Sequence, residues 1–257
     1  MTPVIPVLLY HSVSDRRPQG DSWGAVSHAD FEAHVKAISA SGRVAIGITA
    51  LAAALRAEQP LPDRPVAVTF DDGFADTYDA VELLRDHGLV STVYVTTGEV
   101  GARNRLSARQ LAALASLPGI EVGAHAVRHR HLDELDDGEL AEELGASRSQ
   151  LEDLTQRSIA SFAYPHGSYD GRVRGAVIAA GYDSAAAVKN AVSHPGDDPF
   201  AIARWTVTDG TPAARIVQVL EGERVPLAWA GERMRTRAYR TARRQRRRLF
   251  KSIGVRC

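Results

Sequence analysis

The chain has 257 residues, of which 44% are hydrophobic and 24% are charged, and its formal net charge is zero. This composition provides material for a large buried core and excludes collagen-like, disordered and disulfide-rich proteins. The only cysteine is Cys257, so no intramolecular disulfide can form. Met1–Tyr10 contains two prolines and no basic residue, which favours a strand over a signal peptide. We therefore expect a cytoplasmic protein.

Short β-branched segments alternate with longer amphipathic segments along most of the chain. The predicted strands are Val4–Tyr10, Val66–Phe70, Leu89–Val95, Ile120–Gly123, Ile159–Ala163 and Ser184–Val188. The predicted helices are His28–Ala40, Leu51–Ala57, Ala75–His87, Ala108–Leu117, Asp136–Thr155 and Arg172–Ala180. Thr49 and Ser107 are predicted N-caps, and Gly88 and Gly181 are predicted left-handed residues at helix ends. The alternation predicts an α/β fold with a parallel sheet, open or closed into a barrel.

The net charge of zero hides an asymmetry along the chain. Residues 233–257 contain 11 Arg or Lys and no acidic residue, so the other 232 residues carry 20 basic and 31 acidic groups. We therefore divide the chain into an acidic domain at 1–231 and a basic tail at 232–257. The tail has no helix breaker before Gly254 and is predicted to be helical.

The basic tail has three candidate partners. It can dock as a solvated helix on the acidic domain, bind nucleic acid through phosphate contacts, or contact an anionic membrane surface. We favour peripheral contact with the inner membrane surface, because aromatic residues such as Tyr239 and Phe250 lie among the basic ones. Nucleic acid is the less favoured partner.

Two adjacent carboxylates, Asp71 and Asp72, directly follow the strand Val66–Phe70 and precede Gly73. Such a pair is destabilised by mutual repulsion unless a cation or a proton compensates it. Neighbouring side chains diverge, so one carboxylate can bind a metal while the other faces a substrate. Taken alone, an Asp-Gly pair indicates a turn.

Two histidines, His125 and His129, follow the strand Ile120–Gly123. A spacing of four places them on one face if the segment is helical. Two imidazoles and a carboxylate make a three-ligand site with open positions, which is typical of hydrolytic metal centres. A solvated loop is the alternative for the histidines alone, and His131 is a further candidate ligand or neighbour.

The third cluster, Tyr164-Pro165-His166-Gly167, follows the strand Ile159–Ala163. Pro165 and Gly167 can form a tight turn whose amide groups point into a cleft.

These three ordered clusters resemble the motifs of the polysaccharide deacetylases, the NodB-homology family or carbohydrate esterase family 4. The resemblance covers residues from about Pro3 to about Leu220. It implies a distorted (β/α) barrel of seven or eight units. It also implies a divalent metal, with zinc as the favoured ion, bound by Asp72, His125 and His129. It also implies that Asp71 is the catalytic base and that a backbone amide in the turn at His166 stabilises the developing oxyanion.

The sequence departs from the common family pattern in three places. No histidine follows His194, where many members carry a late Leu-x-His motif. Leu8–Val13, with His11 at its centre, resembles members with this motif permuted to the N-terminus, so we predict His11 as the general acid and His194 as its rival. Ala163 stands where many members carry an arginine that orients the base, and Ala126 replaces a hydroxyl residue.

The resemblance also implies that Arg204-Trp205 supports the wall of the site. A place for Trp205 in the ordinary core is the alternative.

The expected function is removal of N-acetyl groups from an amino sugar, oligosaccharide or polysaccharide. The alternatives are deacylation of another amide or ester, an iron oxygenase with the same ligand types, and a non-catalytic glycan-binding protein. The second carboxylate, Asp71, favours hydrolysis because an oxygenase does not need it.

Overall fold

A computed structural model describes residues 3–15, 24–231 and 241–243. Seven parallel strands close into a barrel in the order β1-β10-β9-β8-β7-β6-β5, because β1 pairs with both β10 and β5. These strands are β1 (Val7–Tyr10), β5 (Pro65–Phe70), β6 (Ser91–Val95), β7 (Ile120–Ala124), β8 (Ser161–Ala163), β9 (Ser184–Val188) and β10 (Ile202–Thr206). β4 (Val44–Ala45) pairs with the start of β5, and β2 (Ser12–Val13) pairs with β3 (Ala25–Val26). The predicted α/β barrel is confirmed, with seven barrel strands.

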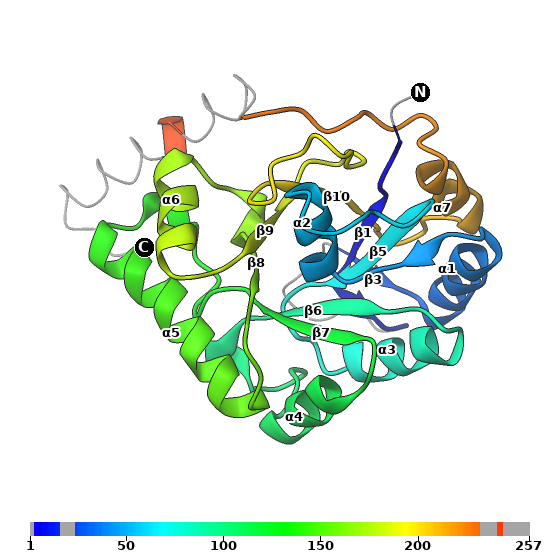
Figure 1. Ribbon diagram of the computed structural model, residues 1–257. Helices are drawn as coiled ribbons and strands as arrows, with labels where there is room; N and C mark the ends of the chain where they lie inside the picture. The colour runs from blue at the N-terminus through cyan, green and yellow to red at the C-terminus, as the bar shows by residue number, and fades with distance from the viewer. Residues whose placement is uncertain (1–2, 16–23, 232–240, 244–257) are drawn as a thin grey trace.

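Helices surround the barrel on its outside (Figure 1). They are α1 (His28–Ala40), α3 (Thr77–Asp86), α4 (Ala108–Ser116), α5 (Asp137–Thr155), α6 (Gly171–Ala179) and α7 (Ala213–Leu220). Ser107 caps α4 in a reciprocal arrangement with Gln110, as its sequence predicts. Gly88 and Gly181 have φ values of 70° and 82°, which confirms the left-handed positions after α3 and α6.

One short helix, α2 (Ile48–Leu55), closes the barrel at the starting ends of its strands. Its residues Ile48, Leu51 and Ala52 belong to the apolar cluster that lines the barrel interior. The N-cap is Gly47, so the prediction of Thr49 as the cap is wrong. Instead, Glu121 of β7 accepts hydrogen bonds from both the N–H and the hydroxyl of Thr49, each at 2.9 Å. The Glu121 carboxylate thus pairs with a backbone N–H in the first turn of α2, whose own N-cap residue, Gly47, has no side chain to do so.

The sequence did not predict β10 or α7. β10 reads Ile-Ala-Arg-Trp-Thr, and the arginine at its centre interrupts the apolar pattern of a buried strand. Arg204 is tolerated in this buried strand because its side chain points into the barrel and forms an ion pair with Asp71. α7 packs against α1 on the outside of the barrel.

The predicted division into a domain at 1–231 and a tail at 232–257 stays a prediction. Most of the predicted helical tail, at 232–240 and 244–257, lies outside the described residues, and only 241–243 can be placed. Among the described residues, no helix combines the length and the apolar character needed to cross a bilayer.

Candidate active site

A cavity of about 860 Å³ opens at the carboxyl ends of the barrel strands. Its lining includes His11, Asp71, Asp72, Arg105, His125, His129, His166, Asn190 and Trp205. The cavity therefore brings together candidate residues from five separate sequence regions: the ends of β1, β5, β7 and β10 and the turn after β8. This is the face at which barrels of this kind carry their sites.

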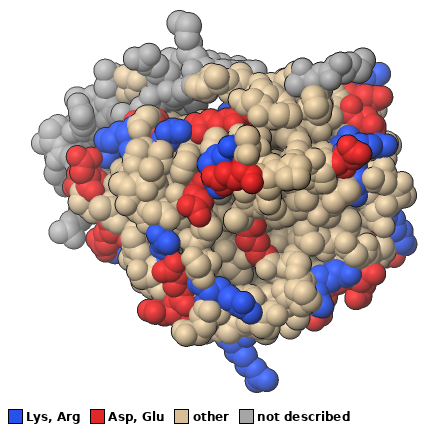
Figure 2. All heavy atoms as spheres, in the orientation of Figure 1, with Lys and Arg blue, Asp and Glu red and all other residues tan. Residues whose placement is uncertain are grey.

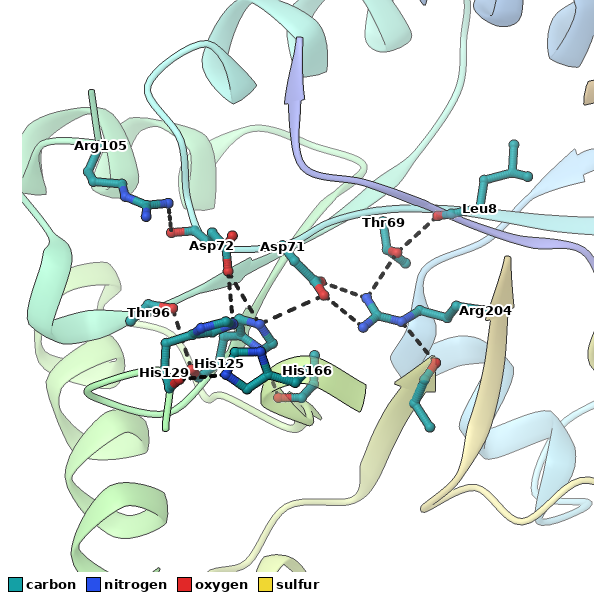
Figure 3. Close-up of polar contacts among 12 residues, drawn as sticks. Leu8, Thr69, Asp71, Asp72, Thr96, Arg105, His125, His129, His166 and Arg204 are labelled. Carbon is teal, nitrogen blue, oxygen red and sulfur yellow. Dashed lines mark hydrogen bonds and ion pairs between the residues drawn. The ribbon is translucent and has the colours of Figure 1, made fainter. Parts of the chain in front are cut away.

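Asp72, His125 and His129 converge on a single point (Figure 3). Oδ1 of Asp72 lies 3.4 Å from Nε2 of His125 and 3.3 Å from Nε2 of His129. Ligands bound tetrahedrally to zinc stand about 3.3 Å apart, given bond lengths of roughly 2.0–2.1 Å. The three ligand atoms all lie within 4.8 Å of one another, so the group is compact enough to hold one divalent ion.

The hydrogen bonds around these three residues prepare them for a cation. Nδ1 of His125 donates to the carbonyl of Ala163 at 2.8 Å, so Nε2 is the atom that faces Asp72 and that a cation would bind. Burial would lower the pKa of His125, but the charges of Asp71 and Asp72 outweigh it and raise that pKa. Oδ1 of Asp72 is buried and has no hydrogen-bond partner among the described residues. A buried acceptor without a donor is costly unless a cation compensates it. The donor set therefore fits a metal of the zinc type.

The electrostatics of the two carboxylates favour their ionised forms. Burial by itself would raise the pKa of Asp72, but the neighbouring His125, whose own pKa is raised, outweighs burial and holds the pKa of Asp72 below its ordinary value. For His129, burial and the neighbouring His125 lower the pKa to about 3. His129 is consequently neutral at physiological pH, as a metal ligand must be.

The segment between the two histidines is a loop and not a helix. Ala126 and His129 have positive φ values of 62° and 50°, so two left-handed residues bend the chain until both imidazoles face Asp72. Glu143 of α5, which is fully buried, accepts hydrogen bonds from the N–H groups of Val127 and Arg128 at 2.8 and 2.9 Å. Its carboxylate therefore fixes the bend that the backbone conformation alone would not favour.

Asp71 points away from Asp72 and is held by Arg204, which reaches it through the barrel interior (Figure 3). The guanidinium donates to both carboxylate oxygens of Asp71, at 2.6 and 2.8 Å. It also donates to the hydroxyl of Thr69 and to the carbonyl of Ala187, both at 3.3 Å. Burial raises the pKa of Asp71, but the charges of Arg204 and His125 prevail and keep it below its ordinary value. Position 163, where an arginine was expected to orient Asp71, is alanine in this chain. Arg204 holds Asp71 instead.

The turn after β8 contributes His166 but not Tyr164. His166 has a φ of 58°, lines the cavity, and donates from Nε2 to the carbonyl of His129 at 3.1 Å. The Tyr164 side chain is fully buried and donates to the carbonyl of Phe200, and Pro165 is buried as well. The side chains of Tyr164 and Pro165 therefore do not line the cavity, and a part for these residues in binding substrate or the oxyanion stays a prediction for the backbone of the turn. Packing of Tyr164 in the core sets the position of the turn instead.

The two candidate general acids lie in different cavities. His11 follows β1 and lines the same cavity as Asp71 and Asp72, with its charge close enough to lower the pKa of both carboxylates. His194 lines a separate cavity, where it lies 3.3 Å from Asp197. Trp205 lines the active-site cavity and also packs against the core. It therefore has both of the places considered from the sequence, in the wall of the site and at the edge of the core.

Comparisons with known proteins agree on one family. The polysaccharide deacetylase family matches residues 58–185. YxkH of Bacillus subtilis (strain 168), which carries the name of a polysaccharide deacetylase, is 25% identical over 207 residues, covering 80% of this chain and 72% of that protein. The chain belongs to the polysaccharide deacetylase family.

Solved structures share the fold of this deacetylase. The Streptococcus pyogenes deacetylase PplD, solved in complex with acetate, superposes with a TM-score of 0.78 at 19% identity, covering 86% of this chain and 99% of that one. A polysaccharide deacetylase from Bacillus cereus gives a TM-score of 0.75 at 23% identity, covering 85% of this chain and 69% of that one. At these identities the likeness is one of fold.

Sequence reasoning missed the roles of two residues at this site. The sequence predicts Arg204 only as part of the wall of the site. Because position 163 is alanine and not arginine, Asp71 needs another cationic partner, and Arg204 is that partner. A lone arginine inside an otherwise apolar segment was the available signal, because a buried guanidinium needs a carboxylate. Glu143 gave no signal, since an acidic residue in an amphipathic helix ordinarily faces solvent.

Substitution of Arg204 tests its hold on Asp71. Arg204→Gln removes the charge that lowers the pKa of Asp71, so that pKa should rise and the acid limb of the pH–rate profile should move to higher pH. The loss of a buried partner should also lower the free energy of unfolding by about 3–5 kcal/mol.

Arg204→Lys is the control that keeps the charge and loses the two-pronged geometry. It should lower kcat by about 10²-fold through misplacement of Asp71, with a smaller movement of the acid limb. If both variants retain full kcat at their optimal pH, Arg204 does not orient the base.

Proposed function

We propose that this deacetylase is a metal-dependent hydrolase that removes N-acetyl groups from an amino sugar, oligosaccharide or polysaccharide. The observation that carries the proposal is the convergence of Asp72, His125 and His129 beside a separately held carboxylate, Asp71. The acetate in the structure of the similar Streptococcus pyogenes deacetylase supports an acetyl group as the acyl group. Hydrolysis of an N-acetyl group releases acetate and leaves an amine.

Asp72, His125 and His129 would hold the metal, and the two-nitrogen, one-oxygen set favours zinc. Such a metal supplies Lewis acidity, which polarises the acetyl carbonyl and lowers the pKa of water. The carbonyl of Ala163 fixes the tautomer of His125, and Glu143 fixes the loop of His129. The chain thus positions its ligands before any substrate arrives.

Three further groups complete the proposed reaction. Asp71, ionised and oriented by Arg204, accepts the proton of the attacking water. The backbone amide of His166, in the left-handed turn, stabilises the negative charge that develops on the acetyl oxygen. His11 gives a proton to the departing amine, and Trp205 forms part of the wall against which the sugar lies.

The alternatives from the sequence now have different standing. Membership of a hydrolase family argues against the iron oxygenase. Deacylation of another amide uses the same groups and differs only in the acyl pocket. A non-catalytic glycan-binding protein would have no need for the buried Arg204–Asp71 pair, whose desolvation costs stability.

The two aspartates should respond differently to substitution. Asp72→Asn removes a metal ligand and should abolish both zinc uptake and deacetylation of an N-acetylated chitooligosaccharide. Asp71→Asn should retain zinc and lower kcat by about 10²–10⁴-fold, the usual effect of losing a general base. Chelator should abolish wild-type turnover and added zinc should restore it. The assignment fails if Asp71→Asn loses the metal while Asp72→Asn keeps it.

His11 and His194 form a matched pair for the general acid. His11→Ala should lower kcat and remove the alkaline limb of the pH–rate profile, because the protonated imidazole is the form that is required. His194→Ala, in the other cavity, should leave both unchanged. The reverse result would assign the acid to His194 and exclude the permuted motif.

We further propose that the basic tail places the enzyme at an anionic membrane surface on the cytoplasmic side. On the face shown in Figure 2, basic and acidic side chains are interspersed. The proposal rests on the sequence of residues 233–257, which contain 11 Arg or Lys and no acidic residue and would be attracted to anionic lipid. The residues concerned, in 244–257, lie outside the described ranges.

The membrane proposal predicts that the intact protein co-sediments with anionic liposomes at low salt. A variant with Arg246, Arg247, Arg248 and Lys251 changed to Gln should remain in solution, because each basic residue near the surface contributes about 1 kcal/mol. Equal sedimentation of both proteins would exclude this role. Binding to DNA in place of liposomes would favour nucleic acid as the partner.

A further inference from the structure

One residue of the basic tail, Arg243, binds the domain beside the active site. In Figure 1 the described piece of the tail, residues 241–243, lies next to α6. Nη2 of Arg243 donates to both carboxylate oxygens of Asp133, at 2.8 and 2.9 Å, and Nε lies 2.5 Å from Oε1 of Glu134. Arg243 is thus held by two carboxylates of the segment that follows the histidine loop.

The socket for Arg243 is built into the fold. The side chain of Asp133 is completely buried, and the hydroxyl of Ser168 donates to it at 3.1 Å from the segment before α6. The Arg243 side chain is only 21% exposed. Two charge-assisted hydrogen bonds to a carboxylate shielded from water are stronger than an ordinary surface ion pair. This contact therefore differs from the loose docking expected of a solvated tail.

A continuous series of contacts leads from Arg243 to the metal ligands. Nη1 of Arg243 lies 3.4 Å from Nε2 of His131, and the His131 ring packs on His166 with centroids 3.9 Å apart. His166 packs on His129 at 4.4 Å and donates to its carbonyl. On its other side, the loop is fixed at Glu143. Arg243 thus acts on the side of the loop where α5 does not.

We propose that Arg243 is a positioning residue of the active site. By holding Asp133 and Glu134 and supporting His131, it keeps His166 and His129 in the arrangement that binds the metal. The inference rests on the proposed metal site, and it adds a residue outside the barrel to that site. It does not depend on what the rest of the tail contacts.

The test is metal affinity measured on the full-length protein with Co²⁺ in competition with a chelator. Arg243→Gln should lower Co²⁺ affinity by roughly tenfold, the lower end of the effect of outer contacts on metal ligands. It should also change the visible absorption spectrum of the bound Co²⁺, because His129 is less well held. Arg243→Lys, which keeps a charge but not the fork, should recover part of the affinity.

Arg174→Gln is the matched control. Arg174 also donates two hydrogen bonds to one carboxylate, that of Asp198, from Nε and Nη2 at 2.6 and 2.9 Å, but it lines the separate cavity of His194. It should leave Co²⁺ affinity and spectrum unchanged. In a double-mutant cycle, Asp133→Asn should add little to the loss caused by Arg243→Gln, because both act through one contact.

The outcomes separate the two proposals. If the wild type takes up one Co²⁺ and Arg243→Gln binds it as tightly as Arg174→Gln, with the same spectrum, the positioning role is wrong and the deacetylase site stands. If the wild type takes up no Co²⁺ or Zn²⁺, the metal site fails, and the role of Arg243 fails with it. A fall in affinity with Arg243→Gln that Arg243→Lys partly reverses supports the proposal.

Discussion

The active site depends on the charge balance around two neighbouring carboxylates that are largely withdrawn from water. Asp71 and Asp72 repel each other, and burial alone would favour protonation of both. The guanidinium of Arg204 compensates Asp71, while His125 and His129 face Oδ1 of Asp72, where a cation would bind. This difference in surroundings supports the proposed roles of Asp71 as the base and Asp72 as a metal ligand. Residues adjacent in sequence thereby acquire different chemistry.

The backbone of the site is strained, and the surrounding structure supports that strain. Asp72, Ala126, His129 and His166 all have positive φ values although none is glycine. Each such conformation costs free energy and persists only where other contacts demand it. Glu143 holds the histidine loop by accepting hydrogen bonds from its backbone. The buried Tyr164, whose hydroxyl donates to the carbonyl of Phe200, holds the turn at His166. Rigid ligands are the result, and they need little reorganisation when a metal or a substrate binds.

Local patterns in the sequence predicted the fold and the position of the site, but not the contacts that hold it. Six barrel strands follow from apolar runs such as Val66–Phe70, and the residues at their carboxyl ends gather in one cavity by the geometry of parallel strands. The seventh, β10, was missed because Arg204 gives it a polar centre. Its partner Asp71 is 133 residues away, and no local pattern records that distance. The histidine spacing suggested a helix, whereas left-handed residues and Glu143 make a loop with the same convergence.

The histidine loop is held unequally on its two sides, and this asymmetry connects the tail to the chemistry. On the inner side, Glu143 is fully buried and belongs to a helix of 19 residues, so it can move only if the domain opens. On the outer side, Arg243 is partly exposed and reaches Asp133 from a separate segment. Ion pairs with one exposed partner respond to their surroundings far more than buried ones do. If the basic residues of 233–257 also bind an anionic surface, one segment of the chain would contact both that surface and, through Arg243 and Asp133, the neighbourhood of the metal ligands.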